Sequence, residues 1–309
     1  MTVLVTGGAG FIGSHLADRL VAQGRPVTLL DDLRTGRVAN IRHLLDHEGF
    51  ELRVGDLRDP AVLKAVADRG IFDVIYHLAA IHYIPECVAH PVETLSVNVV
   101  GTQALLSSIS CRRLVFASTG DVYAPREGPH REDESPAPFN VYGLSKFFGE
   151  RLLESASRVR ESAAFVIARL FNVYGPRETN PHIIPQLVQQ IRGGHHIRLG
   201  NLWPRRDYSY VADTVEALLA LGDVPLSTPL DVFNVGTGDT ASVEELVTLL
   251  EQILGTSIQI EFDTERARLI ERPHLQADIS KIQRTTTWRP THSLRDGLKQ
   301  MCMAEGLLP

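Results

Sequence analysis

Short apolar runs alternate with longer amphipathic stretches through the first two-thirds of the chain. Several of the short runs are apolar throughout and rich in β-branched residues, which is typical of strands covered on both faces. The runs that predict strands span residues 3–5, 27–30, 52–54, 74–77, 113–116 and 164–168, and the stretches that predict helices span residues 12–23, 61–69, 97–108 and 144–157. This alternation predicts a parallel sheet with right-handed crossovers.

The pattern changes after about residue 171, where prolines and glycines become frequent and the predicted helices are shorter. A strand-like run at residues 232–235 predicts a return to the first sheet. We therefore predict an α/β fold in which a Rossmann-type, doubly wound parallel sheet carries a smaller, discontinuous α/β lobe. The sheet domain would comprise residues 1–170 with about 206–237, and the lobe about 171–205 with 238–309.

Composition and charge exclude several classes of protein. The chain has 309 residues, with 31 basic against 37 acidic side chains and a formal net charge of −6, which argues against a nucleic-acid partner. No apolar run approaches the roughly 18–20 residues of a membrane span. The chain begins on a strand-like segment with no basic leader, and its three cysteines are far apart in no metal-ligand spacing. These features predict a cytoplasmic protein with free thiols and no membrane partner.

A glycine-rich turn lies directly between the first predicted strand and the first predicted helix. Its glycines are Gly7, Gly10 and Gly13, in a GxxGxxG spacing. Glycines permit a tight turn and a close approach of the backbone to a pyrophosphate, and the N–H groups of the helix N-terminus hold the anion. The turn therefore predicts a dinucleotide site.

An acidic pair ends the second predicted strand. Asp31 is placed to accept hydrogen bonds from both ribose hydroxyls of NAD, where its charge would repel the 2′-phosphate of NADP. Asp32 could share this role, whereas Arg34 and Arg37 could serve a phosphate. NAD is the predicted cofactor, with NADP left open.

Tyr142 and Lys146 stand four residues apart in a predicted helix, so their side chains share one face. A free phenol has a pKa near 10. A lysine cation and a positively charged nicotinamide would both favour the phenolate, which makes the tyrosine a candidate general base.

These motifs, together with Asp56-Leu57, His77 to Ala80, and Asn98 with Gly101-Thr102, resemble the extended short-chain dehydrogenase/reductase family, in its nucleotide-sugar epimerase and dehydratase branch. His82 stands where relatives often have a lysine, and it could face the cofactor. The cofactor contacts implied by the residues and the resemblance are Gly7, Gly10, Phe11, Ile12, Gly13, Asp31, Asp32, Asp56, Leu57, Leu78, Ala79, Ala80, Asn98, Ser118, Tyr142 and Lys146.

The resemblance also implies catalytic roles. Tyr142 would take the proton from the O4 hydroxyl of a sugar, while Lys146 would bind the nicotinamide ribose and tune the phenol. Thr119, chosen over Ser118, would hydrogen-bond the same O4. Hydride removal at C4 would give a 4-keto sugar.

The identity of residue 121, here Asp121, bears on which reaction follows oxidation at C4. Dehydratases and uronate decarboxylases of the family carry glutamate at this position, and aspartate is one methylene shorter. The acid–base set of a dehydratase is therefore incomplete, which favours an NAD-dependent 4-epimerase, with a UDP-sugar the expected substrate. The alternatives are a 4,6-dehydratase or UDP-glucuronate decarboxylase using Asp121, an NADP-dependent 4-reductase, and a non-catalytic dinucleotide-sensing protein.

The remaining expectations concern the substrate, metals and assembly. By resemblance, the substrate contacts would be Thr119, Asn172, Arg206, Arg268 and Glu271. No HExxH spacing occurs and hydride chemistry needs no metal, so no metal is expected. Relatives commonly form homodimers through two helices of each subunit, here about residues 90–108 and 142–157.

Overall fold

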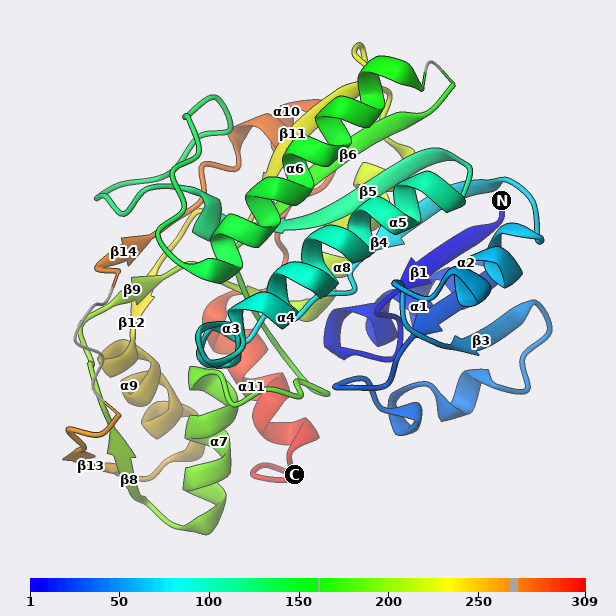
Figure 1. Ribbon diagram of the computed structural model, residues 1–309. Helices are drawn as coiled ribbons and strands as arrows, with labels where there is room; N and C mark the ends of the chain where they lie inside the picture. Colours follow the sequence, from blue (N-terminus) through cyan, green and yellow to red (C-terminus); the bar gives the residue numbers. More distant parts are fainter. Residues whose placement is uncertain (161, 267–271) are drawn as a thin grey trace.

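A parallel sheet of seven strands forms the centre of the computed structural model, which describes residues 1–160, 162–266 and 272–309 (Figure 1). The strand order is β11-β6-β5-β4-β1-β2-β3. The strands are β1 (Val3–Thr6), β2 (Val27–Asp31), β3 (Phe50–Val54), β4 (Phe72–His77), β5 (Cys111–Thr119), β6 (Ala164–Leu170) and β11 (Leu230–Val235). The order reverses beside β1, which confirms the predicted doubly wound sheet, and the predicted strand at 232–235 pairs in parallel with β6.

Helices cover both faces of this sheet because successive side chains of each strand point to opposite sides. Val3 and Val5 of β1 pack with α1 (Phe11–Ala22) and α8 (Val211–Asp223) in one core, while Leu4 packs in a second core. The helices on the second face are α2 (Pro60–Ala67), α5 (Gly101–Ser108) and α6 (Val141–Val159). The connection into α5 runs through α3 (Ile84–Ala89), α4 (Pro91–Leu95) and a π-helical turn (Ser96–Val100), so the helix predicted from residue 97 begins in that turn.

The smaller lobe joins chain segments that are distant in sequence. Its paired strands are β7 (Asn172–Tyr174) with β10 (Tyr208–Tyr210), β8 (His196–Leu199) with β13 (Gln259–Phe262), and β9 (Arg205–Arg206) with β12 (Ala241–Ser242) and β14 (His274–Leu275). Its helices are α7 (Ile183–Gly193), α9 (Val243–Leu254), α10 (Ser280–Thr285) and α11 (Leu294–Ala304). Short 3-10 turns occur at Val38–Asn40, Arg42–Leu44 and Gly120–Val122. Among the described residues, no helix is both long and apolar enough to cross a membrane.

One buried carboxylate connects the segments of the lobe to the sheet. Asp207 lies between β9 and β10, and its oxygens accept hydrogen bonds from the backbone N–H groups of Thr237, Gly238 and Ala277 at 2.8, 2.9 and 3.2 Å. Burial raises its pKa to about 6, while these donors oppose the increase. Asp207 thereby holds the loop after β11 and the segment after β14 together through hydrogen bonds.

Candidate active site

A cavity of about 700 Å³ opens at the carboxyl ends of the central strands, where the smaller lobe meets the sheet. Such crevices are the usual ligand sites of doubly wound sheets. Of the predicted site residues, the cavity brings together Gly7, Gly10, Phe11, Ile12, Gly13, Asp31, Asp32, Asp56, Leu57, Leu78, Ala79, Ala80, Ser118, Thr119, Asp121, Tyr142, Lys146, Asn172 and Arg206. Arg268 and Glu271 lie outside the described residues.

The glycine-rich turn is packed too closely for side chains. A Cβ on Gly13 would lie 2.2 Å from the Gly7 carbonyl oxygen, and Gly7 itself has φ of +71° against the backbone of Ala79. The first helical hydrogen bond of α1 runs from the backbone N–H of Ser14 to the carbonyl oxygen of Gly10 at 3.1 Å. The N–H groups of the residues before Ser14 in this first turn therefore have no acceptor within the helix. The turn therefore forms the cradle and the anion-binding helix end that a dinucleotide pyrophosphate requires.

Asp31 lies at the rim of this cradle with its carboxylate fixed. Its Oδ2 accepts the N–H of Ala9 at 2.9 Å and its Oδ1 that of Leu33 at 2.8 Å. Burial raises the pKa of Asp31, and the two backbone donors lower it. The guanidinium of Arg34 pairs with Glu93 at 2.8 Å and with Asp32 at 3.7 Å, so this arginine is neutralised by two acids.

Three predicted cofactor contacts use their polar atoms within the protein. Asp56 pairs with Arg58 at 2.6 Å, and hydrogen bonds from Arg58 lower the pKa of the Asp56 carboxyl. Asn98 does not line the cavity. Its side-chain amide accepts the backbone N–H of Ile81 and donates to the Ile81 carbonyl oxygen, each at 2.8 Å. Ser118 donates its hydroxyl to Glu150 at 2.6 Å. Glu150 in turn forms a buried ion pair with Arg169 at 2.8 Å, so the Ser118 hydroxyl is used by a structural network although the residue lines the cavity.

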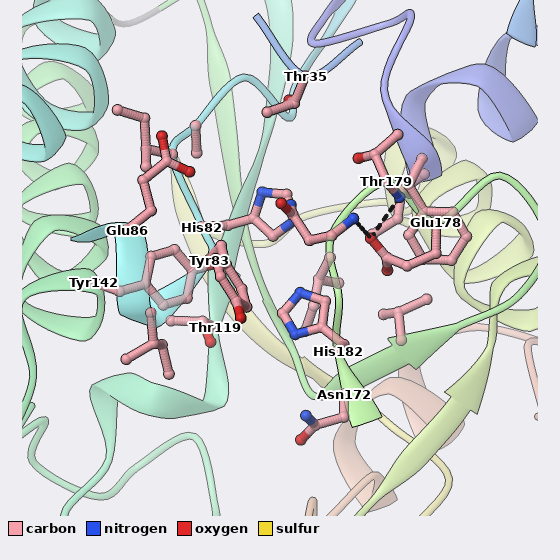
Figure 2. A pocket seen from close by; sticks show the side chains of 18 of the residues that line it. Thr35, His82, Tyr83, Glu86, Thr119, Tyr142, Asn172, Glu178, Thr179 and His182 are labelled. Atoms are coloured by element: carbon pink, nitrogen blue, oxygen red, sulfur yellow. Dashed lines mark hydrogen bonds between the residues drawn. The ribbon is translucent and has the colours of Figure 1, made fainter. Parts of the chain in front are cut away.

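Thr119 and Tyr142 meet where β5 ends and α6 begins (Figure 2). Asn140 caps α6 by accepting the N–H of Gly143 at 2.7 Å. A Cβ on Gly143 would lie 2.4 Å from the backbone oxygen of Asp121, so glycine is needed for this close approach. Burial raises the pKa of Tyr142, the nearby Asp121 charge adds to the increase, and a hydrogen bond with Thr119 lowers the pKa.

Lys146 lies one helical turn after Tyr142 and is 3% exposed. Its ammonium sits over the ring of Phe116, 4.9 Å from the centroid. Burial lowers the pKa of Lys146 to about 7. Burial thus favours the neutral phenol and the neutral amine, so the charged pair needs further stabilisation.

Asp121 lies in the turn that follows β5, at the cavity wall. Its backbone N–H donates to the Thr119 hydroxyl at 3.2 Å. Arg272 donates to the carbonyl oxygen of Gly120 at 3.4 Å and to that of Tyr123. Burial lowers the pKa of Arg272, and the nearby Asp121 charge opposes this decrease.

The part of the cavity formed by the smaller lobe is basic. Arg206, Arg266 and Arg272 line it together with Asn172, which starts β7. Charge-assisted hydrogen bonds from arginines suit a diphosphate. The cavity lining therefore combines a glycine-rich anion cradle, an arginine cluster and the Thr119–Tyr142–Lys146 group.

The same cavity contains a polar group that sequence reasoning largely missed. His82 lines it as foreseen, but so do Glu178, Asn180 and His182 from the loop before α7. Burial raises the pKa of Glu178 to about 7 and lowers that of His82 to about 4. The signal in the sequence was the run of polar residues among prolines at 177–182, whose place in the cavity depends on how the smaller lobe folds.

Comparison with known proteins identifies the family. The family model described as GDP-mannose 4,6 dehydratase matches residues 4–301. The chain belongs to the extended short-chain dehydrogenase/reductase family. Within this family the match lies in the nucleotide-sugar epimerase and dehydratase branch, as the sequence motifs predicted.

Three relatives within the short-chain dehydrogenase/reductase family illustrate the range of reactions. UDP-glucuronic acid decarboxylase 1 of Xenopus tropicalis is 32% identical over 308 residues, which cover 96% of this chain and 70% of that protein. The UDP-glucuronic acid 4-epimerase of Bacillus cereus, solved with UDP-glucuronic acid and NAD, is 29% identical with a TM-score of 0.89 over 99% of each chain. The UDP-glucose 4-epimerase of Thermotoga maritima, solved with UDP-glucose, is 30% identical with a TM-score of 0.88 over 98% of each chain.

Proposed function

We propose that this protein is an NAD-dependent nucleotide-sugar 4-epimerase that acts on a UDP-sugar. The observation that carries the proposal is the placement of Thr119, Tyr142 and Lys146 in one cavity with a dinucleotide cradle and an arginine cluster. The Asp31 carboxylate at the rim and the paired state of Arg34 support NAD over NADP. The epimerases from Bacillus cereus and Thermotoga maritima agree with this reading.

The chemistry follows from Tyr142 and Lys146, which lie one helical turn apart on α6 and line the cavity. Bound NAD would supply the hydride acceptor at C4 and return the hydride to the opposite face of the ring. Tyr142 accepts the O4 proton while Thr119 holds O4 in place, and Tyr142 gives the proton back when the ketone is reduced. Lys146 keeps its proton in this complex, because a phenolate one helical turn away compensates the ammonium charge.

A second function is favoured by one specific observation. Asp121 lines the cavity next to Thr119, in the position where decarboxylases of the branch carry a glutamate, and one curated relative is a UDP-glucuronic acid decarboxylase. In this alternative, oxidation at C4 would be followed by loss of carbon dioxide, or of water for a 4,6-dehydratase. The first step is shared, so the product distinguishes the reactions.

The test is incubation of the purified protein and NAD with UDP-glucose, UDP-galactose, UDP-glucuronic acid and UDP-galacturonic acid. We expect a mass-neutral product whose NMR spectrum shows inversion at C4. A product lighter by carbon dioxide or water would replace the epimerase assignment with the second function. Stoichiometric consumption of added NADPH would indicate a reductase instead.

We also propose that the protein is a homodimer. Exposed apolar side chains gather on α3, α4, the π-helical turn and α6, which lie side by side (Figure 1). They include Val88, Val92, Val100 and Phe148, with Val92 81% exposed. Exposed apolar side chains on helices that pack together mark a protein interface, and the predicted helix pair about 90–108 and 142–157 contains most of them.

A further inference from the structure

The structure assembles a group of nitrogen and oxygen donors that no part of the proposed reaction uses. His82 comes from the loop after β4, and Glu178 and His182 come from the loop before α7. One donor atom of each of these three residues lies within 4.8 Å of the other two. Figure 2 shows the three side chains directed toward a common region of the cavity, in the same view as Tyr142 and Thr119.

The ring of His82 is held with one nitrogen directed to the group. One ring nitrogen bonds the backbone of Ala80, and Nε2 is 3.0 Å from the Asn180 amide Nδ2. An amide N–H is a donor, so Nε2 presents its lone pair and the other nitrogen carries the proton. Metal-binding histidines typically have this arrangement, in which a backbone acceptor fixes the ring and leaves the second nitrogen to ligate.

His182 and Glu178 complete the set. The His182 ring stacks on His82 with centroids 5.8 Å apart, and Tyr83 packs edge-on against His182 at 5.6 Å, which fixes both imidazoles. Glu178 uses Oε1 to accept the N–H groups of Thr179 and Asn180 at 3.0 and 3.1 Å. Within the described part of the chain, no lysine or arginine forms a salt bridge with Glu178, so a cation would supply the missing countercharge.

We propose that His82, Glu178 and His182 bind a divalent transition-metal ion, with Zn²⁺ as its representative. Two imidazoles and one carboxylate suit zinc, cobalt or nickel, whereas magnesium and calcium prefer oxygen ligands. Binding requires the three donor atoms to move closer together, since zinc–nitrogen bonds are about 2.0–2.1 Å. It also requires Zn²⁺ to replace the Asn180 amide as the partner of His82 Nε2. Three protein ligands leave a coordination position open to the cavity, where an oxygen of a bound molecule can enter.

The test measures metal binding directly and does not depend on the proposed epimerase activity. Equilibrium dialysis of the full-length protein against Zn²⁺ is expected to give one tightly held ion per chain. Titration with Co²⁺ should give the visible absorption bands of a low-coordinate site with nitrogen ligands. The variants His82→Ala, His182→Ala and Glu178→Gln are each expected to lower Zn²⁺ affinity by at least about tenfold.

Matched controls separate this site from surface histidines and from misfolding. His47→Ala and His195→Ala remove exposed histidines and should leave the affinity unchanged. Zn²⁺ should raise the unfolding temperature of the wild-type protein but not that of folded His182→Ala, because only a native site that binds the ion is stabilised by it. Affinity that survives in all three cavity variants, or a wild-type protein that retains no Zn²⁺, would overturn the proposal.

Discussion

Burial acts on the two residues at the centre of the proposed chemistry in ways that oppose their function. It raises the pKa of Tyr142 and lowers that of Lys146 to about 7, so each charged form is unfavourable alone. A phenolate and an ammonium in the same cavity stabilise one another, so the two charges become accessible together. Lys146 therefore lowers the stability of the ligand-free protein near neutral pH, whereas the Tyr142 phenol is neutral there in both the folded and the unfolded chain.

Replacement of Tyr142 by phenylalanine tests its role as the acid–base group. We expect Tyr142→Phe to lower kcat for C4 inversion by about 10²–10⁴, because the O4 proton loses its acceptor. Affinity for UDP should change little, since the ring is retained. Tyr83→Phe, which alters another phenol of the same cavity, is the control for kcat. Steady-state kinetics and calorimetric UDP titration make the comparison, and wild-type turnover in Tyr142→Phe would contradict the assignment.

Lys146 gives a stability prediction with a defined sign. Its pKa in the folded protein is about 7, below the ordinary lysine value of 10.5, so the unfolded chain binds the proton more tightly between these values. The destabilisation is complete below pH 7 and disappears as the pH rises toward 10.5. Lys146→Met should therefore raise the free energy of unfolding of the ligand-free protein by a few kcal/mol near neutral pH, at about 1.4 kcal/mol per pKa unit.

Urea unfolding at a pH just below 7 and at a pH near 10 measures this effect. The increase in the free energy of unfolding caused by Lys146→Met should be smaller at the higher pH, while epimerase activity is lost at both pH values. Lys64→Met is the matched control, because Lys64 is exposed and pairs with Asp68 at the surface. An equal gain at both pH values would show that the lysine charge is not the cause.

At the scale of elements, the first strand–turn–helix unit fixes the dinucleotide site. A Cβ on Gly13 would meet two backbone groups, the Gly7 carbonyl at 2.2 Å and the Gly8 Cα at 2.8 Å, and neither can rotate away. Gly13→Ala should therefore displace α1 from β1 and weaken NAD binding by at least about tenfold, measured by fluorescence titration. Gly193→Ala is the control, since a Cβ there meets nothing within 4 Å. Equal NAD affinity in the two variants would disprove the close-packing argument.

Asp207 makes the corresponding connection for the smaller lobe. Asp207→Asn keeps the size of the side chain but replaces one acceptor oxygen with a donor that faces backbone N–H groups. We expect the free energy of unfolding to fall by about 2–4 kcal/mol, because buried donors lose their partner. Chemical denaturation provides the measurement, with the exposed Asp239→Asn as a control. A change below about 0.5 kcal/mol would show that the carboxylate is not required.

At the scale of the whole molecule, the apolar surface on α3, α4 and α6 predicts the oligomeric state. Light scattering after size-exclusion chromatography should give twice the chain mass for the wild-type protein. A charge at Val100, in Val100→Glu, should shift the protein to a monomer, because an unpaired carboxylate is costly inside an apolar interface. Ile71→Glu places the same charge on another exposed apolar side chain and should leave the dimer intact. A monomeric wild-type protein would contradict the assignment.

Local pattern and motif spacing determined much of this protein. Apolar strand runs must be covered on both faces, which predicted the doubly wound sheet, and the helical period placed Tyr142 and Lys146 on one face of α6. The glycine spacing likewise follows from backbone contacts within one turn. These features depend on residues close together in the chain, so periodicity and spacing record them.

The tertiary structure decided the rest, because contacts between distant segments leave no regular spacing. The small sheets of the second lobe pair residues 196–199 with 259–262, and strands of two to four residues are too short for a clear pattern. Ser118 donates its hydroxyl to Glu150, and Asn98 holds the backbone of Ile81. Both contacts depend on neighbours that only the fold brings close. The meeting of His82 with Glu178 and His182 has the same origin: nearly a hundred residues separate two loops that the sheet edge brings together, so no sequence motif announced the group.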